Sequence, residues 1–457
     1  MDNNITTANN AASPAAKKAP QLPSMRQLPL IMRIIMAITP PQLRIAMWHS
    51  MCVALCCLAT RVRFHYTYDT FPHALLLKCL VEAEQSGGKS FARTMIDGML
   101  MKPLKDRDDD QRRKEQDYRE LKQRTGKNET LPAAPKTTIR TCPIAISIAM
   151  LVKRADAPQR YFGTPLTLWS FTEEMATVVE SNRRAFANIR SIERTSYDLG
   201  STYGNDYLSD QAYSATVDIM QCSLYLGTPN AIDAYADNSF IEGGGVTRTI
   251  FVKLPGSLGD EAPEFKHMSN DDRKAIDDML KLMDDDVYAT DGTIQPEHYI
   301  NMRWLDKTVR RWCDEQRNKV LMNGSLAHDT FYKRSSVSAF REAALCAYLY
   351  SLEGVAQADI ERRCRQIYLY AAENILDSML SKWGKRFEDL SRKRMNPESQ
   401  TRVSVFDKLD NTFTREQLDQ LLKQLQLTTQ SKVFVSKWKA KGWVKETEKM
   451  KYQKVMK

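Results

Sequence analysis

The sequence predicts an α/β fold built on a parallel sheet, followed by an all-helical segment and a small basic C-terminal unit. Between residues 74 and 255, short apolar runs alternate with helical patterns, which is typical of a parallel sheet. Residues 256–390 show the spacing of long amphipathic helices, and residues 401–457 contain several short elements rich in lysine. At 457 residues the chain exceeds the size at which one hydrophobic core keeps growing, so several domains are expected.

The first 73 residues are predicted to form a disordered leader and a helical lead-in. Residues 1–24 are polar and rich in Ala, Asn and Pro, without the apolar core of a secretory signal. Residues 25–73 show helical spacing and then an alternating run, Arg61–Tyr68, that is typical of a strand. The apolar run Leu30–Ala59 is interrupted by Arg33 and by two prolines, so it falls short of a bilayer span. We expect two buried helices there and no membrane partner.

The stretch Ala74–Ala92 combines a strand pattern, a glycine turn and the start of a helix. An apolar run to Val81 is followed by Glu-Ala-Glu-Gln-Ser-Gly-Gly-Lys-Ser, and the segment from Phe91 fits a helix. This is the context of a phosphate-binding P-loop, in which backbone N–H groups face an anion at a helix N-terminus. We call residues 83–90 the glycine loop. Ala83 stands where the first glycine of the pattern belongs, so the turn there is expected to differ slightly.

The glycine loop predicts that ATP binds together with Mg²⁺. The Lys89 ammonium would reach the β- and γ-phosphates, and the Ser90 hydroxyl would take one Mg²⁺ position. The predicted nucleotide-binding residues are Gln85, Ser86, Gly87, Gly88, Lys89, Ser90 and Phe91. The alternative is a chance Gly-Gly turn at the start of a helix.

A second apolar run delivers carboxylates. Pro165–Ser170 resembles a strand buried in a parallel sheet, and it leads to Thr172, Glu173 and Glu174. The carboxyl edge of such a strand, beside a P-loop, is where an NTPase needs a metal ligand and a general base. Glu173 is therefore a candidate Mg²⁺ ligand, and either glutamate is a candidate base. The alternative is a helix N-terminus that Thr172 caps, with acids in the first turn.

Two further segments supply candidate catalytic residues. The strand candidate Ala215–Gly227 ends at Thr228, a polar residue placed to sense the γ-phosphate and the attacking water. Three glycines shortly before Arg248 form a turn that could project this arginine into the phosphate site of a neighbouring subunit. The alternative is a flexible loop with an incidental arginine. Other expected elements are strands at 137–142 and 249–254 and a helix at 143–154.

The last two hundred residues predict helices and then a compact basic unit. In the helical subdomain, residues 256–390, Arg334 and Arg341 would lie either over bound nucleotide or on the surface. Residues 391–400 read as a polar basic linker. Residues 401–457 hold 13 Lys and Arg against 6 Asp and Glu, and three short helices followed by two short strands indicate a winged-helix-like DNA-binding domain. Its candidate DNA-binding residues are Lys432, Lys437, Lys439 and Lys445. The alternative is a basic protein-docking domain.

Composition narrows the partners and the compartment. The net charge of +10 favours an anionic partner, and DNA is the partner we expect. None of the nine cysteines has C-x-x-C spacing, which indicates buried thiols in a reducing, cytoplasmic setting and not a zinc site.

Taken together, these motifs resemble an uncharacterised P-loop NTPase family of bacterial mobile and integrative elements, regarded as primase-helicase-like. The motifs that carry the resemblance are Ser86–Ser90, the charged helix Asp106–Tyr118, Trp169–Glu174, Gly227–Pro229, Arg248 and the basic tail. The resemblance implies an ATP-hydrolysing homo-oligomer, such as a ring, around DNA. It gives Glu174 (or Glu173) the acidic role and Arg248 the role of a finger acting in trans. No primase module is present on this chain, so primer synthesis would need a separate primase or polymerase.

The leading hypothesis is an ATP-dependent DNA motor or remodeller acting in replication of a mobile element. One alternative is a non-enzymatic DNA-binding regulator in which nucleotide acts as a conformational switch. Another is a scaffold for a partner polymerase or recombinase.

Overall fold

The computed structural model describes residues 20–85, 87–125, 130–182, 190–205, 214–256, 261, 263–394, 405–425, 427, 430–440, 442–448 and 450–455. The expected leader therefore lies almost wholly outside the described residues. The expected linker begins instead as the end of a long helix, and its residues 395–400 lie outside them too.

A five-stranded, all-parallel sheet forms the centre of the chain, as expected for an α/β protein. Its strand order is β4-β5-β8-β3-β9, with β3 between β8 and β9. The strands are β3 (Lys78–Glu82), β4 (Thr141–Cys142), β5 (Leu168–Thr172), β8 (Gln221–Gly227) and β9 (Ile250–Lys253). The single strand expected at 215–227 is two strands, because β7 (Ala215–Asp218) pairs antiparallel with β6 (Thr202–Asn205) outside this sheet.

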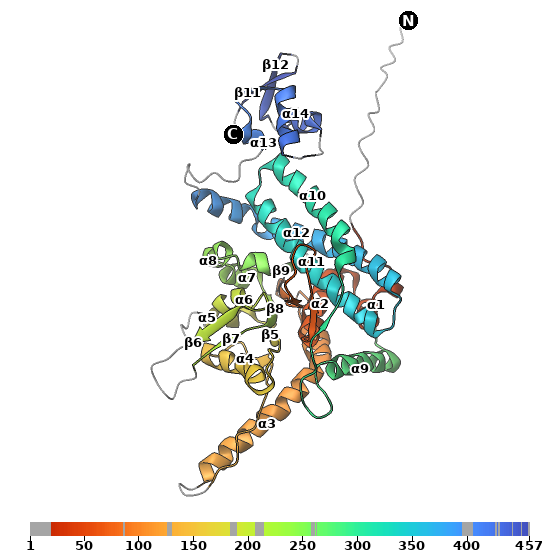
Figure 1. Cartoon of the computed structure of the whole chain (residues 1–457), viewed down its shortest axis with the longest axis vertical. Helices are drawn as coiled ribbons and strands as arrows, with labels where there is room; N and C mark the ends of the chain where they lie inside the picture. Colours follow the sequence, from red (N-terminus) through yellow and green to blue (C-terminus); the bar gives the residue numbers. More distant parts are fainter. Residues whose placement is uncertain are drawn as a thin grey trace.

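Helices connect and cover the strands (Figure 1). Those within this region are η3 (Ala92–Leu100), α3 (Lys102–Arg124), α4 (Ile148–Phe162), α5 (Met175–Asn182), α6 (Arg190–Thr195), α7 (Pro229–Tyr235), α8 (Asn238–Glu242) and η5 (Val246–Arg248). The helix expected at 143–154 begins later, at Ile148, because the Ser147 hydroxyl accepts from the Met150 N–H and caps it there. The helix α3 extends away from the sheet as an arm (Figure 1).

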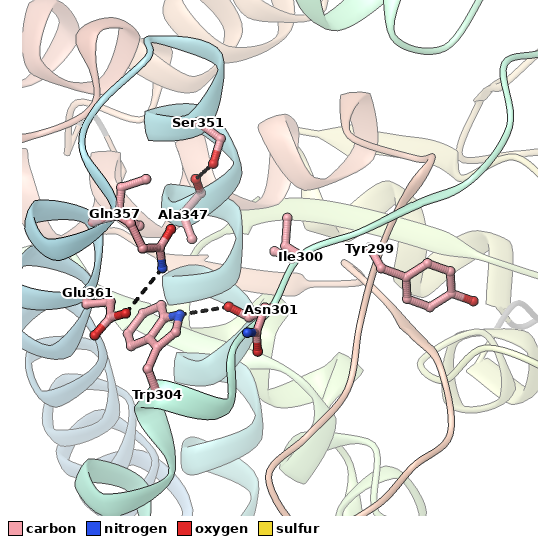
Figure 2. Close-up of a pocket in the computed structure, with 9 residues that line it drawn as sticks. Tyr299, Ile300, Asn301, Trp304, Ala347, Ser351, Gln357 and Glu361 are labelled. Carbon is pink, nitrogen blue, oxygen red and sulfur yellow. Dashed lines mark hydrogen bonds between the residues drawn. The ribbon is translucent and has the colours of Figure 1, made fainter.

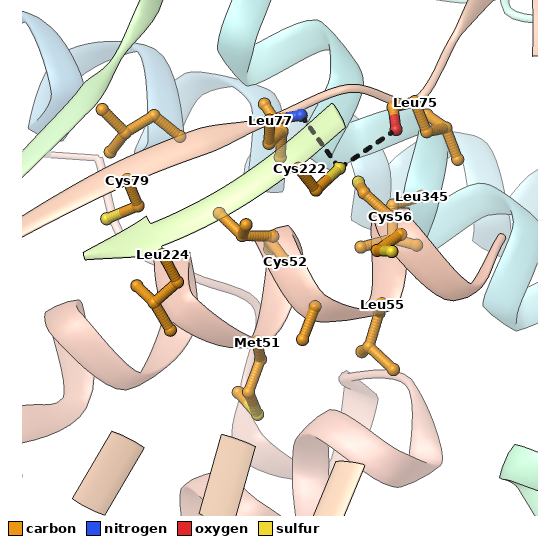
Figure 3. Close-up of a cluster of buried hydrophobic side chains, with 14 of the residues drawn as sticks. Met51, Cys52, Leu55, Cys56, Leu75, Leu77, Cys79, Cys222, Leu224 and Leu345 are labelled. Carbon is orange, nitrogen blue, oxygen red and sulfur yellow. Dashed lines mark hydrogen bonds between the residues drawn. The ribbon is translucent and has the colours of Figure 1, made fainter. Parts of the chain in front are cut away.

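The helical lead-in, residues 25–73, packs against the parallel sheet through α2. Its elements are η1 (Met25–Gln27), α1 (Leu30–Ile38), η2 (Pro41–Leu43), α2 (Arg44–Leu58), β1 (Val62–Phe64) and β2 (His73–Ala74). Helix α2 contacts β3, β5, β8 and β9, and 13 of its 15 residues are buried. Figure 3 shows Cys52 and Cys56 of α2 among the apolar side chains below β3 and β8, with Leu345 beside them. The two helices are therefore buried, as the sequence predicts, and in the described part of the chain no helix has the length and apolar character to cross a membrane.

The helical segment joins the same hydrophobic core. It contains α9 (Asn270–Asp285), β10 (His298–Tyr299), η6 (Arg303–Leu305), α10 (Asp306–Asn323), α11 (Leu326–Leu352) and α12 (Gln357–Arg394). Strand β10 pairs with β1, and α12 packs against β9. One continuous core runs from Leu28 to Trp383, so the lead-in, the sheet and these helices form one packed body.

The C-terminal residues have a core of their own. The elements are α13 (Val405–Lys408), β11 (Thr412–Thr414), α14 (Arg415–Gln424), α15 (Ser431–Ala440), β12 (Val444–Glu448) and β13 (Lys451–Lys454). The strands form a small antiparallel sheet in the order β11-β13-β12. The sequence predicts three helices and two strands here, and β11 is an additional strand between the first two helices. Phe406, Phe413 and Trp438 lie at the centre of this core.

Candidate functional site

The glycine loop follows β3, a strand whose outgoing connection runs opposite to that of its neighbour β8. The connection that leaves β3 runs to the edge strand β4, whereas the connection that leaves β8 runs the other way, to β9. Neighbouring parallel strands whose connections diverge leave a crevice at their carboxyl ends, and ligands of open α/β sheets bind there. Glu82 of β3 pairs with Gly227 of β8, so the glycine loop and Thr228 both start at this crevice.

The turn within the loop requires glycine. Gly88 has φ +78°, in the left-handed region, and a Cβ there would come 2.9 Å from Cγ of Pro263. The Gly87 N–H donates to the Glu84 carbonyl at 3.0 Å. Pro263 therefore packs on the outside of the turn at Gly88, and the chain that follows β9 contacts the glycine loop.

Ala83 fits the loop without the conformation that glycine provides. Its N–H donates to the Gly227 carbonyl at 3.0 Å, and its side chain is buried. Among the described residues other than glycine, only Met450 has a positive φ. The absence of the first glycine thus imposes no left-handed strain at Ala83, and the loop is tied directly to the end of β8.

The remaining loop residues differ in exposure. Lys89 is half-buried, Ser90 and Gln85 are exposed, and Ser86 lies outside the described residues. A helical turn begins at Ser90 and continues as the π-helix η3. The Phe91 side chain is 2% exposed and packs in the core, so only the backbone of Phe91 can contribute to a nucleotide site.

Glu173 faces the helix that follows the glycine loop. Arg93, three residues after Ser90, places its Nη1 3.0 Å from Glu173 Oε1. The pair brings the end of β5 next to the first turn after the loop, although β8 separates β5 from β3 in the sheet. The structure thus joins two sequence-predicted site segments that are about 80 residues apart.

Glu174 takes a different place. Its N–H donates to the Thr172 hydroxyl at 3.0 Å, and its side chain is exposed just before α5. Thr172 ends β5 and α5 begins at Met175, so the Thr172 hydroxyl bonds a residue that precedes the helix. The Glu173 carboxylate is the one held toward the loop helix. Of the two glutamates, Glu173 has the better position to act on a nucleotide.

Thr228 occupies the N-cap position of α7 but makes no side-chain capping hydrogen bond. Its half-buried side chain follows Gly227, whose carbonyl binds Ala83. Gly227 itself allows a close approach, because a Cβ there would lie 2.4 Å from Cβ of Met175. Thr228 therefore stands beside the loop, where a polar side chain can contact a ligand in the crevice.

A second charged group sits at the same edge. Glu82 is buried at the end of β3, and the Lys382 ammonium of α12 binds it together with Asp233 of α7, the latter at 2.8 Å. Lys253 of β9 lies 3.8 Å from Glu82. Burial alone would lower the pKa of Lys382, but its hydrogen bonds to Asp233 and Glu82 raise that pKa above its usual value. The helical segment is thereby fixed to the edge that carries the glycine loop.

Arg248 lies at the opposite end of the strands from the glycine loop. It ends η5 just before β9, at the amino ends of the strands, while the glycine loop lies at their carboxyl ends. A five-residue strand such as β3 spans roughly 16 Å, so Arg248 stays away from the loop of its own chain. Its Nη1 donates to the Gly244 carbonyl at 3.1 Å, and burial, with the charge of Arg334 next, lowers its pKa.

The four candidate DNA-binding lysines belong to α15 and β12. Helix α15 turns Phe434, Val435 and Trp438 into the small core and leaves Lys432 exposed at its first turn. The Nζ atom of Lys437 lies 3.4 Å from Sδ of Met322 in α10. The Lys439 ammonium is paired with Glu446, and Lys445 is exposed. Lys432 is therefore the α15 lysine best placed for a phosphate contact.

The described residues contain no group of three or more His, Cys, Asp or Glu side chains that could hold a metal ion. The two candidate ligands, Ser90 and Glu173, would supply one hydroxyl and one carboxylate, and Mg²⁺ takes few protein ligands together with substrate phosphates. Sequence reasoning missed Arg93, Glu82 and Lys382. Of these, only Arg93 could have been found from the sequence, because a basic residue three positions after Ser90 lies on the same face of the helix as Ser90.

A separate pocket of about 400 Å³ lies between the chain around β10 and helices α11 and α12 (Figure 2). Its lining residues are Tyr299, Ile300, Asn301, Trp304, Ala347, Ser351, Gln357, Ile360 and Glu361. The Trp304 indole donates to the Asn301 carbonyl at 2.7 Å, and the Gln357 amide donates to Glu361 at 3.3 Å. Because its polar groups bind one another, this pocket defines no ligand class.

Comparison with known proteins adds no assignment to this geometry. A scan against models of protein families finds no match, and a search of curated proteins finds none either.

Proposed function

We propose that this protein is a P-loop ATPase that moves on or remodels DNA, acting in replication of a mobile element. The observation that carries the proposal is the order of the five strands. The glycine loop follows β3, the Thr228 turn follows its neighbour β8, and Glu173 follows β5, the next strand along. The segments proposed to bind phosphate, contact the γ-phosphate and supply the carboxylate thus follow three adjacent strands, at the carboxyl ends of the sheet.

The roles follow from position. The Gly88 amide and the Lys89 ammonium would hold the phosphates, with Ser90 and Glu173 as Mg²⁺ ligands. Mg²⁺ would supply charge neutralisation of the phosphates. Glu173 would orient the attacking water, and Thr228 would contact the γ-phosphate from β8. Arg248, at the far edge of the sheet, fits a neighbouring subunit and not its own loop.

The C-terminal unit supports DNA as the partner. Its order of helix, strand, two helices and two strands, with β11 paired to β13, is compatible with the winged-helix-like domain that the sequence predicts. Helix α15 would enter a groove, with Lys432 on a phosphate.

Three variants test the hydrolysis. Lys89→Ala should abolish ATP turnover, and Glu173→Gln should lower it at least 100-fold while nucleotide still binds. Glu174→Gln is the matched control, one residue away, and should keep turnover within a few-fold of the wild type. Turnover is measured with and without single-stranded and duplex DNA. A Lys89→Ala protein that still hydrolyses ATP, or a wild type that DNA does not stimulate, would refute the proposal.

A mixing experiment tests the oligomer. If Arg248 acts in trans, Arg248→Ala and Lys89→Ala subunits are each inactive alone, but mixed oligomers contain intact sites between them. Partial recovery of turnover on mixing is the expected result. Full turnover by Arg248→Ala alone would remove Arg248 from the site.

A second candidate, nucleotide as a conformational switch, is favoured by the Arg93–Glu173 ion pair, because that pair occupies the carboxylate that hydrolysis requires. It predicts nucleotide binding without turnover in the same assays.

A further inference from the structure

A pocket between α3 and α4 has no role in the proposed hydrolysis. It encloses about 270 Å³, below the usual range of small-molecule pockets. We call it the α3–α4 pocket. Its lining residues are Glu115, Tyr118, Arg119, Lys122, Ala134, Pro135, Thr137, Lys153, Arg154, Asp156, Ala157, Arg160 and Tyr161. Five of these are cationic and two are acidic, so the lining carries a net charge of +3.

The charges are layered by depth. The side chains of Glu115 and Asp156 are only 18% and 14% exposed, whereas those of Arg119 and Arg160 are 59% and 55% exposed. Glu115 accepts two hydrogen bonds from Arg154, and Thr137 donates to the same carboxylate at 2.6 Å. The acids are therefore held at the floor, where Arg119 pairs with Glu115 at 3.4 Å and Arg160 with Asp156 at 2.8 Å. More than half of each arginine side chain remains exposed at the mouth of the pocket, where a phosphate would compete with the floor carboxylate.

The α3 arm is built for a polar role. Of its 23 residues only Leu104 and Asp108 are buried, so most of the helix contributes little to the core. Polar bonds attach its first half to the edge strand: Asp108 accepts from the Thr141 N–H at 2.6 Å, and Arg112 donates to the Thr141 hydroxyl. The far end of the arm projects from the body (Figure 1). A polyanion is the partner that an exposed, cation-rimmed helix suits.

Two aromatic side chains complete the surface. Tyr118 on α3 and Tyr161 on α4 line the pocket among its cations. A positively charged groove with aromatic rings is the arrangement by which proteins hold single-stranded nucleic acid, with cations on the backbone and bases stacked on the rings. Bases within a duplex are already stacked on one another, so this surface selects the single strand.

We propose that the α3–α4 pocket binds single-stranded DNA, with Arg119, Lys122 and Arg160 on its phosphates and Tyr118 and Tyr161 against its bases. This inference rests on the proposed function in taking DNA as the partner. It adds a second DNA contact, distinct from the C-terminal unit, at the β4 edge of the sheet.

The test compares two triple variants of the full chain. The pocket variant is Arg119→Ala/Lys122→Ala/Arg160→Ala. The matched control, Arg113→Ala/Lys114→Ala/Arg124→Ala, removes three exposed cations of the same arm that do not line the pocket. Binding of fluorescein-labelled oligo-dT and of a duplex of equal length is followed by fluorescence anisotropy at several salt concentrations. All substituted side chains are exposed, and thermal unfolding monitors folding.

The pocket variant should bind oligo-dT at least tenfold more weakly, and the magnitude of its salt slope should fall by about 2, since each single-strand phosphate contact contributes about 0.7. The control should bind within about twofold of the wild type. Tyr161→Ala should weaken oligo-dT binding without changing the salt slope. Equal weakening in the two triple variants, or weakening of duplex binding alone, overturns the inference.

ATP turnover of the wild type is read on the same preparation. Turnover together with unaltered oligo-dT binding by the pocket variant overturns this inference and leaves the proposed function standing. If the pocket variant binds oligo-dT more weakly but the wild type shows no ATP turnover, the proposed hydrolysis is overturned and the inference about the pocket stands.

Discussion

The Nη1 atom of Arg93 lies 3.0 Å from Oε1 of Glu173, and this ion pair joins the helix after the glycine loop to the end of β5. The Arg93 side chain is 64% exposed, so solvent screens the pair and its contribution to stability is at most about 1 kcal/mol. A bound nucleotide can therefore break it at little cost. The pair holds the carboxylate proposed for hydrolysis near the loop but neutralises it.

Removing Arg93 should release that carboxylate. Arg93→Ala is expected to raise ATP turnover in the absence of DNA by up to about fivefold, which is the rate equivalent of a 1 kcal/mol contact. Steady-state phosphate release measures it. Lys102→Ala, which removes a cation of equal exposure paired with Asp106, is the control and should change nothing. A fall in turnover would mean that Arg93 contacts the nucleotide itself.

The close approach of β8 to α5 gives a prediction on stability. A Cβ at Gly227 would lie 2.4 Å from Cβ of the buried Met175, so Gly227→Ala must push α5 and the Glu173 segment away from β8. We expect a loss of about 1–3 kcal/mol in the free energy of unfolding, measured by denaturant titration.

The matched control is Gly256→Ala, because among the described residues no atom lies within 4 Å of a Cβ built on Gly256. This variant should unfold like the wild type. Equal midpoints for the two alanine variants would contradict the packing described at Gly227.

Local patterns predict the segments that meet at this candidate site. Short apolar runs predict the strands β3, β5 and β9, and the polar residues that follow these runs and β8 make the loop, the carboxylates and Thr228 candidates. Alternation of strands and helices predicts the parallel sheet. The order of the strands, by contrast, depends on pairing between distant segments and has no local signal.

Long-range ion pairs were the other limit. Arg341 was expected over the nucleotide or on the surface, and it is neither: its side chain is fully buried, binding Asp198 at 2.7 Å and the Tyr66 hydroxyl at 2.8 Å. An arginine whose partners lie far away in the sequence looks like any surface arginine. The same is true of Lys382 and Glu82, which are 300 residues apart.

The Lys382–Glu82 pair predicts strong coupling between α12 and the sheet. Among the described residues, Lys382→Met leaves the buried Glu82 carboxylate with only the cation of Lys253 nearby, at 3.8 Å, and should cost about 3 kcal/mol of unfolding free energy. Adding Glu82→Gln should recover part of this loss, since no unpaired charge then remains. Lys385→Met, an exposed lysine on the same helix, is the control. Additive effects of the two substitutions in a double-mutant cycle would show that the residues do not interact.

A buried lysine predicts a pH dependence. Lys78 of β3 donates to the Ser196 hydroxyl at 2.9 Å and to the Glu193 carbonyl, and burial lowers its pKa to about 8 from an ordinary value near 10.5. Between pH 8 and 10.5 the unfolded chain therefore binds more protons at this position than the folded chain does. The contribution of Lys78 to stability must rise with pH in this window, by at most about 1.4 kcal/mol per unit.

The measurement compares the wild type with Lys78→Met by denaturant unfolding at pH 7.5 and pH 9.5. Buried cysteines and tyrosines titrate in both proteins, so only the difference between the two curves reports Lys78. That difference should shift in favour of the wild type at the higher pH. A difference that is constant or shifts the other way would show that Lys78 is not held with a lowered pKa.

The last prediction separates the lysines of α15. Lys432 is exposed at the first turn of this helix, whereas the Lys439 ammonium is already paired with Glu446. Because the N-terminal residues of a recognition helix contact the groove, Lys432→Ala should weaken duplex binding more than Lys439→Ala and lower the magnitude of the salt slope by about 0.9. Lys423→Ala, on the exposed side of α14, is the matched control and should leave binding within twofold. If Lys423→Ala and Lys432→Ala weaken the duplex equally, α15 does not enter the groove, and the basic surface of this unit acts only through its net charge.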